Sequence, residues 1–235
     1  MAANLLRIMN NHTAALLGGI DLETLKQFLA RCTIRTFHAE QQIIQQGAML
    51  DHAFLVLRGA VEVSILDIEG NRVLAHLAQP GEVVGEVELL SGLFCVANCM
   101  ARPGTMVASF DLPLLRSVIP GERLLKNLAR LFHDRLARDN RYHLLAMFYC
   151  VEDRIRSHLL SLTTPDNPSA DISQADLAAF SGCSRQTVNR TLAQLRDEGI
   201  VELGRGRIVV LDRERLQQLA MGVKPEGQKP TRNKP

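Results

Sequence analysis

The sequence predicts an α+β protein with three parts: an N-terminal antiparallel β-barrel of jelly-roll type, a long dimerisation helix and a C-terminal winged helix-turn-helix. Three observations support this fold class. Residues 33–111 form short apolar runs separated by glycines, a pattern typical of many short strands. Residues 122–150 keep apolar residues at helical spacing. Residues 173–211 combine a short helix, a glycine turn, a longer helix and two short strands.

The composition is that of a folded protein without a membrane segment. The chain has 235 residues, of which 46% are hydrophobic and 22% are charged. It lacks an apolar run of the ~18 residues that cross a bilayer, and its N-terminus does not resemble a secretory signal. We therefore expect a cytoplasmic protein that has no membrane partner. The five cysteines include no CxxC pair, so we expect neither a disulfide framework nor a metal site.

The first 120 residues are expected to form a sensor domain. Asp21 is placed to cap a helix whose apolar residues recur at helical spacing. Seven apolar runs then predict strands at 42–46, 53–57, 61–66, 73–77, 83–84, 96–100 and 106–110. The tripeptide Glu69-Gly70-Asn71 predicts a hairpin tip between two of these strands.

Residues 121–150 are expected to form one long helix. Leucines at 124, 128 and 131 trace one apolar row, and Leu125, Phe132 and Leu136 trace another. A helix of this length rarely buries its whole apolar surface on one small barrel, so we expect a homodimer. The alternative is a helix that packs only along its own domain.

Residues 151–221 are expected to form the winged helix-turn-helix, and residues 222–235, rich in Pro, Gly, Lys and Arg, a disordered tail. Ser173 and Ser184 are placed to cap two helices, and Gly182 lies in the turn between them. On the second helix, Val188, Leu192 and Leu195 recur at the spacing of a buried face.

The opposite face of the second helix carries residues of a kind that reads DNA. Arg185, Gln186, Asn189 and Arg190 cluster there, in the half of the helix that enters a major groove. Arginine pairs with guanine O6 and N7, and Gln or Asn pairs with adenine N6 and N7. The two strands that follow flank Gly204-Arg205-Gly206 and predict a wing. Arg205 and Arg207 are then placed to meet phosphates.

These motifs resemble the Crp–Fnr superfamily, the bacterial regulators related to the cyclic AMP receptor protein. The string from Gly182 to Arg190 resembles the recognition-helix signature of that family, and the glycines at 47, 59, 81 and 85 match its barrel. The resemblance implies that Arg185, Gln186 and Arg190 contact bases, while Ser184 and Thr187 contact phosphates. Many relatives carry Glu where this chain has Gln186, so the preferred half-site is expected to differ.

The effector site departs from the family pattern. Gly85-Glu86 matches the pair that contacts ribose in cyclic-nucleotide binders. Cys95-Val96 stands where those binders carry an arginine and a hydroxyl residue for the phosphate. Asp139 and Asn140 stand where the family reads the base. We therefore do not expect conventional cyclic AMP binding. Haem, a redox-active thiol, an altered nucleotide pocket and activity without an effector all stay open.

Two other classes of function fit the sequence less well. An enzyme finds no support, because the chain has no GxSxG, P-loop or HExxH motif. A cyclic-nucleotide regulatory subunit that does not bind DNA would explain the barrel but not the helix-turn-helix. We therefore expect a transcription regulator whose partners are a palindromic site on double-stranded DNA and RNA polymerase.

Overall fold

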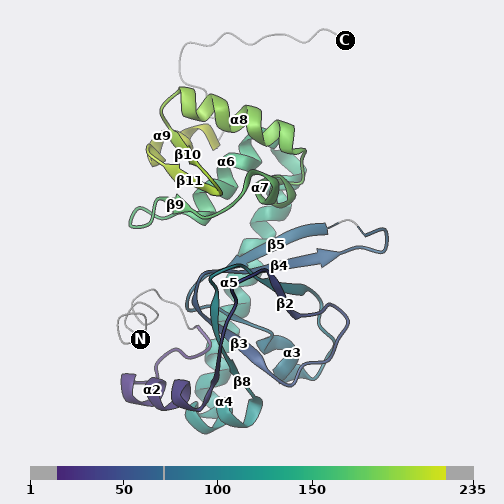
Figure 1. The fold of residues 1–235 in the computed structure, drawn as a ribbon, viewed down its shortest axis with the longest axis vertical. Helices are drawn as coiled ribbons and strands as arrows, with labels where there is room; N and C mark the ends of the chain where they lie inside the picture. The colour runs from purple at the N-terminus through teal and green to yellow at the C-terminus, as the bar shows by residue number, and fades with distance from the viewer. Residues whose placement is uncertain (1–14, 71, 221–235) are drawn as a thin grey trace. The chain divides into compact units, whose positions relative to one another are not determined.

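A computed structural model describes residues 15–70 and 72–220 of the chain. It divides into two compact units, one on each side of the boundary between Arg138 and Asp139, and each is described by itself (Figure 1). The predicted tail at 222–235 lies outside the described residues. Within the described ranges, no helix is both long enough and apolar enough to cross a membrane.

The first unit contains two antiparallel sheets of four described strands each. The first sheet has the order β1 (Thr33–Thr36), β8 (Met106–Phe110), β3 (Ala53–Arg58) and β6 (Val83–Val84). The second has the order β2 (Gln41–Ile44), β7 (Asn98–Ala101), β4 (Val61–Leu66) and β5 (Arg72–Ala78). The β4–β5 pair is the predicted hairpin. Some paired strands, such as β3 and β8, are distant in sequence, and pairing of this kind is typical of a jelly roll.

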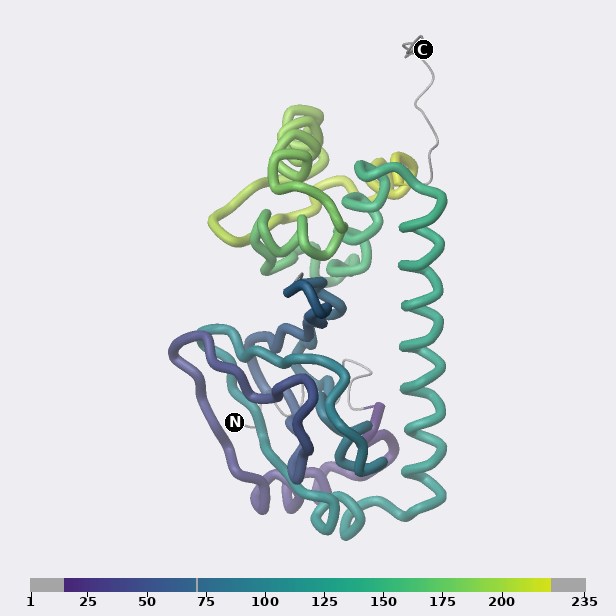
Figure 2. The backbone as a smooth tube through the Cα atoms, turned by 90° about the vertical axis from the view of Figure 1, so that its right-hand side faces the viewer, coloured from purple at the N-terminus to yellow at the C-terminus, as the bar shows by residue number. Residues whose placement is uncertain are grey.

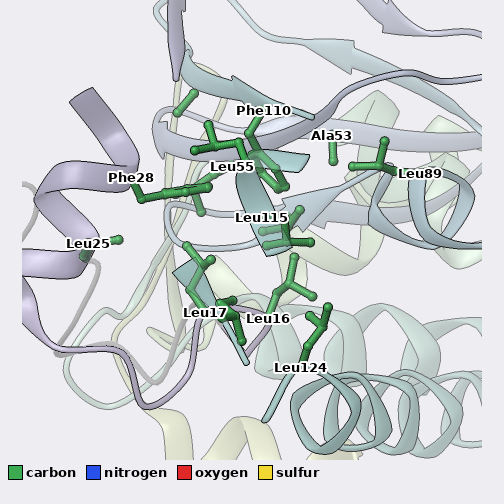
Figure 3. Close-up of a cluster of buried hydrophobic side chains, with 14 residues drawn as sticks. Leu16, Leu17, Leu25, Phe28, Ala53, Leu55, Leu89, Phe110, Leu115 and Leu124 are labelled. Atoms are coloured by element: carbon green, nitrogen blue, oxygen red, sulfur yellow. The ribbon is translucent and has the colours of Figure 1, made fainter. Parts of the chain in front are cut away.

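The helices α2 (Leu22–Arg31) and α4 (Leu112–Val118) close one side of the first core. Asp21 and Asp111 cap them by accepting hydrogen bonds from the N–H groups of Thr24 and Leu114, each at 2.8 Å. In Figure 3, Phe28 of α2 reaches toward Phe110 of β8; their ring centroids lie 5.2 Å apart in an edge-to-face arrangement. The caps stabilise the first turns of the two helices, and Phe28 of α2 and Leu115 of α4 pack in the same buried core as Phe110.

A glycine is required where β3 turns into β4. Gly59 has φ 76°, and a Cβ built on it would lie 2.7 Å from the Cα of Thr105. The buried hydroxyl of Thr105 donates a hydrogen bond to the carbonyl oxygen of Ala60 at 2.9 Å and fixes this approach. A side chain at position 59 therefore has neither the backbone conformation nor the space that it needs.

Helix α5 (Gly121–Phe148) is one uninterrupted helix of 28 residues (Figure 2). In the first unit, Leu124 and Leu131 are buried, and the amide of Asn127 donates to the carbonyl oxygens of Leu16 and Gly18 at 3.0 and 2.9 Å. The second predicted row remains exposed: Leu125, Phe132 and Leu136 are 69%, 45% and 62% accessible. This helix thus buries one face and leaves an apolar face uncovered.

The second unit forms a helical core beside a small sheet. It contains α6 (Val151–Leu162), α7 (Gln174–Ser181), α8 (Arg185–Asp197) and α9 (Arg213–Ala220). Its strands are β9 (Ser169–Ala170), β10 (Val201–Gly204) and β11 (Arg207–Val210), in the sheet order β10-β11-β9. Ile155 and Leu159 of α6 and Leu177 of α7 are fully buried with the apolar face of α8.

The predicted fold class is confirmed. The chain has an antiparallel β unit, a long helix and a C-terminal helix-turn-helix followed by a β-hairpin.

Candidate nucleic-acid interface

The turn between α7 and α8 is formed as the sequence predicts. Gly182 adopts φ 60° and ψ 47°, a left-handed conformation, and ends α7. Ser184 caps α8, because its hydroxyl oxygen accepts a hydrogen bond from the N–H of Thr187 at 3.2 Å. Ser173 caps α7 in the same way through the N–H of Asp176, at 3.1 Å.

Helix α8 has two chemically distinct faces. Val188, Leu192 and Leu195 are at most 1% exposed and belong to the core of the second unit. The other face is solvent-exposed and carries Arg185, Gln186, Asn189 and Arg190, with the exposed Ser184 at its start and the half-buried Thr187 beside them. Burial of the apolar row fixes the rotation of the helix, so the four long polar side chains all project away from the core.

The wing is a hairpin of β10 and β11. Gly204 pairs with Arg207 at its end, and Gly206 takes φ 70° in the turn. Arg205 and Arg207 are both exposed. Arg207 donates to the hydroxyl of Ser169 and lies 3.4 Å from a carboxylate oxygen of Asp171. The wing therefore presents two cations at one edge of the unit.

A groove of about 440 Å³ brings the wing and the helix-turn-helix together. Arg185, Arg205 and Arg207 line it, and so do Ser173 and Gln174 at the start of α7. Three guanidinium groups and the N-terminal end of a helix favour an anion there. The spacing of the sequence motifs did not predict the contribution of α7 to this groove.

One cation of the exposed α8 face is already paired. A guanidinium nitrogen (Nη2) of Arg190 lies 3.1 Å from Oε1 of Glu152, in the first turn of α6. The backbone N–H of Glu152, followed by hydrogen bonds from the Cys150 thiol and the Arg190 guanidinium, holds the pKa of this carboxyl below its usual value. Glu152 is therefore ionised at neutral pH and places a negative charge beside the face.

In the first unit, the predicted effector residues fall into a buried part and an exposed part. Gly85, with φ 82°, precedes α3 (Glu86–Ser91), and a Cβ there would lie 2.8 Å from the Leu50 side chain. Glu86 is fully buried, and its Oε1 lies 2.6 Å from Nη2 of Arg135 on α5. Burial raises the pKa of Glu86, while the Arg135 charge opposes that rise. Sequence reasoning missed Arg135 because nothing in its local pattern marks it.

The segment after α3, which contains Cys95 and Val96, contributes no cationic side chain to the predicted effector site. Cys95 is 3% exposed and Val96 is 72% exposed. The backbone of Cys95 pairs with Gly47 and Ala48, with N···O distances of 2.7 and 2.8 Å. Asp139 and Asn140 are exposed on α5 and belong to the second unit, whereas the other four predicted residues belong to the first.

The thiols of the first unit have little thiolate character. Burial raises the pKa of Cys99 to about 12 and also raises the pKa of Cys95. A thiol that stays protonated is a poor nucleophile, so these two positions do not favour a redox switch. Among residues 15–70 and 72–220, no three His, Cys, Asp or Glu side chains gather in a way that could hold a metal ion.

Comparisons with known proteins identify the family. Residues 34–120 match the model of a cyclic nucleotide-binding domain, and residues 153–219 match that of a Crp-like helix-turn-helix domain. The cyclic AMP receptor protein of Thermus thermophilus is 30% identical over 207 residues, covering 87% of this chain and 96% of that protein. The chain belongs to the Crp–Fnr superfamily.

Two further similarities agree with this assignment. The cAMP-activated global transcriptional regulator CRP of Salmonella typhimurium is 28% identical over 196 residues, covering 80% of this chain and 93% of that protein. The structure of FixK2 from Bradyrhizobium japonicum superimposes with a TM-score of 0.71 at 23% identity, over 80% of this chain and 96% of that one, and shares the fold. As a Crp–Fnr member the chain is a DNA-binding transcription regulator.

Proposed function

We propose that this Crp–Fnr regulator acts in the cytoplasm as a homodimer that binds a palindromic DNA site in a sequence-specific way and contacts RNA polymerase there. The observation that carries the proposal is the exposed face of α8, where Arg185, Gln186, Asn189 and Arg190 project together from a helix whose other face is buried. The sequence motif and the family match support the same role.

Base recognition follows from the chemistry of these side chains. Arginine offers a planar fork of donors that matches O6 and N7 of guanine, and the amide of Gln or Asn both donates to and accepts from adenine. Arg185 and Arg190 are therefore assigned to guanine, and Gln186 and Asn189 to adenine. Many relatives carry Glu at the position of Gln186, and a Glu carboxylate accepts a hydrogen bond from N4 of cytosine. With Gln186 at this position, the preferred half-site should not contain that cytosine.

Contacts to the sugar-phosphate backbone of the DNA are assigned to the remaining residues of the site. Ser184 and Thr187 lie at the N-terminus of α8, where hydroxyl groups reach phosphate oxygens. Arg205 and Arg207 extend from the wing beside the groove that Gln174 also lines. These contacts fix the position of the domain on the duplex but carry no sequence information.

The exposed row of α5 supports the homodimer. Leu125, Ala129, Phe132 and Leu136 are all exposed and follow the alternating spacing of four and three residues of a coiled-coil seam. Covering this row with the same row of a second copy would remove its apolar surface from water. A dimer would also present two recognition helices, which a palindrome requires.

The dimer is tested by mass in solution. Leu136→Glu places a charge in the seam and should shift the mass measured by light scattering from two chains toward one. Leu93→Glu is the matched control, because Leu93 is also exposed, at 66%, but lies after α3. A wild-type monomer, or equal effects of the two changes, would contradict the assignment.

The effector is proposed to be something other than conventionally bound cyclic AMP. The chain has no arginine between Arg72 and Arg102, and Arg135 already pairs with Glu86. A buried phosphate without a cationic partner is unfavourable. A nucleotide-responsive pocket of altered chemistry is the second candidate, because Gly85 and the buried Glu86 are retained. Calorimetry with cyclic AMP should show no binding heat, and micromolar affinity would refute this part.

The DNA-binding proposal is tested by selection from a random duplex library with the full chain. The selected sequences should converge on an inverted repeat whose half-sites are one helical turn apart, about 34 Å. Binding should weaken steeply as salt rises, because each phosphate contact releases counterions. Arg205→Ala should lower affinity for all sequences alike and reduce the salt slope by about one. Failure to enrich any sequence would overturn the proposal.

A further inference from the structure

The contact between Glu152 and Arg190 is a feature that the proposed function does not explain. A carboxylate beside a DNA-reading surface repels phosphates, so by itself it weakens binding. Yet Glu152 of α6 lies 3.1 Å from Arg190 of α8, a residue 38 positions further along the chain. The pair is therefore built by the tertiary fold and is not a chance neighbour along one helix.

Glu152 is the better-fixed partner of the two. Its side chain is 33% exposed, whereas that of Arg190 is 74% exposed. Glu152 lies in the first turn of α6, where its own backbone N–H contacts the carboxylate and keeps it ionised. Ile155, one turn further along α6, is fully buried and anchors the helix in the core. The carboxylate thus has a defined position, and the long arginine side chain adapts to it.

The contact leaves most of the guanidinium available. Arginine has five N–H donors in a rigid plane, and the contact with Glu152 engages one terminal nitrogen. Such a contact removes rotamer freedom from Arg190 before DNA arrives, and that freedom would otherwise be lost on binding. It also competes with the phosphates for the same cation.

We propose that Glu152 is a positioning residue that sets sequence discrimination: it holds Arg190 for a base edge and keeps this cation from the DNA backbone. The proposal rests on the proposed function, in which Arg190 reads a base. On a correct site, Arg190 keeps Glu152 and gains the base. On an incorrect site, Arg190 must break the pair to reach a phosphate, so sequence-independent affinity is suppressed.

Asp171 provides the matched comparison. It lies 3.4 Å from Arg207 of the wing, also within the second unit, and it is 81% exposed. Arg207 is assigned to phosphate and not to a base. Loss of the Asp171 charge should therefore strengthen binding to every sequence by the same factor, whereas loss of the Glu152 charge should favour incorrect sequences.

The experiment measures dissociation constants of the full chain for its selected duplex and for a scrambled duplex of equal length. Glu152→Gln should tighten binding to the scrambled duplex about three- to tenfold, with a salt slope steeper by about one as Arg190 gains a phosphate. Affinity for the selected duplex should change less, so discrimination falls. Asp171→Asn should strengthen both complexes equally.

A double-mutant cycle separates positioning from simple charge repulsion. In an Arg190→Ala background, Glu152→Gln should no longer change discrimination between the two duplexes. In the Glu152→Gln single variant, the loss of discrimination should be confined to the base pair whose preference Arg190→Ala abolishes. Equal gains on both duplexes, or the same gain without Arg190, would overturn the proposal, as would no change at all. If the wild-type chain shows no salt-dependent DNA binding, the proposed function fails instead.

Discussion

Acidification should selectively destabilise the second unit through His158. This side chain on α6 is 4% exposed. Its ring centroid lies 4.9 Å from that of Tyr142 and 4.4 Å from that of Phe180. Burial, with a smaller contribution from the charge of Arg154, lowers the pKa of His158 from 6.5 to about 4. Protonation of this imidazole therefore opposes the folded state.

The size of the effect follows from proton linkage. The unfolded chain takes up the proton near pH 6.5, and the folded unit does so only near pH 4. The unfolded state thus binds more protons below pH 6.5, so the free energy of unfolding falls as the pH is lowered. Each unit of pKa difference corresponds to about 1.4 kcal/mol, which gives a loss of about 2 kcal/mol between pH 7 and pH 5. The full loss, below pH 4, is about 3 kcal/mol.

Tyrosine fluorescence in a urea titration measures this quantity in the intact chain. The chain has no tryptophan, and its two tyrosines, Tyr142 and Tyr149, both lie in the second unit. The urea midpoint should fall by about 1–2 M between pH 7 and pH 5. His158→Phe keeps an aromatic ring and removes the titration, so its midpoint should change much less. An equal fall in both proteins would refute the assignment to His158.

Three further changes test the packing. Leu192→Ala, at a fully buried site of α8, should lower the stability of the second unit by about 2–5 kcal/mol in the same urea assay. Gly59→Ala should destabilise the first unit by more than about 1 kcal/mol, because φ is 76° and Thr105 occupies the space; an unchanged melting temperature by circular dichroism would contradict this. Arg135→Met leaves the buried Glu86 without its cation and should lower the melting temperature of the first unit, and adding Glu86→Gln should restore most of it. No recovery in the double variant would argue against the ion pair.

Periodicity predicted the long helix, the helix-turn-helix and most strands of the first unit, but it missed β1, α3, α4 and β9, whose two to seven residues are too few to show a period. Leu192 and Leu195 recur at helical spacing because α8 buries one side, and the short runs of the first unit alternate with turns that Gly59 and Gly85 make possible. Local signals of this kind are strong because capping serines, turn glycines and apolar spacing all depend on neighbours along the chain.

The partners of the charged residues could not be predicted in this way. Glu86 meets Arg135 across 49 positions of sequence, and Glu152 meets Arg190 across 38. Such pairs are set by the packing of elements and leave no periodic trace. The same holds for the contribution of Gln174 to the groove beside the wing. Arg185, Gln186, Asn189 and Arg190 lie together on the exposed face of α8, but nothing in the sequence pattern indicated the carboxylate of Glu152 beside them.

The central claim is that the exposed face of α8 reads base sequence. It is tested most directly by comparing Arg185→Ala with Arg196→Ala, a control on the same helix whose guanidinium pairs with Asp197 at 2.7 Å. Arg185→Ala should reduce the preference for the selected duplex over the scrambled one by about tenfold or more, the worth of one good base contact, and leave the mass in solution unchanged. Arg196→Ala should keep that preference. An Arg185→Ala protein with wild-type preference would contradict the account.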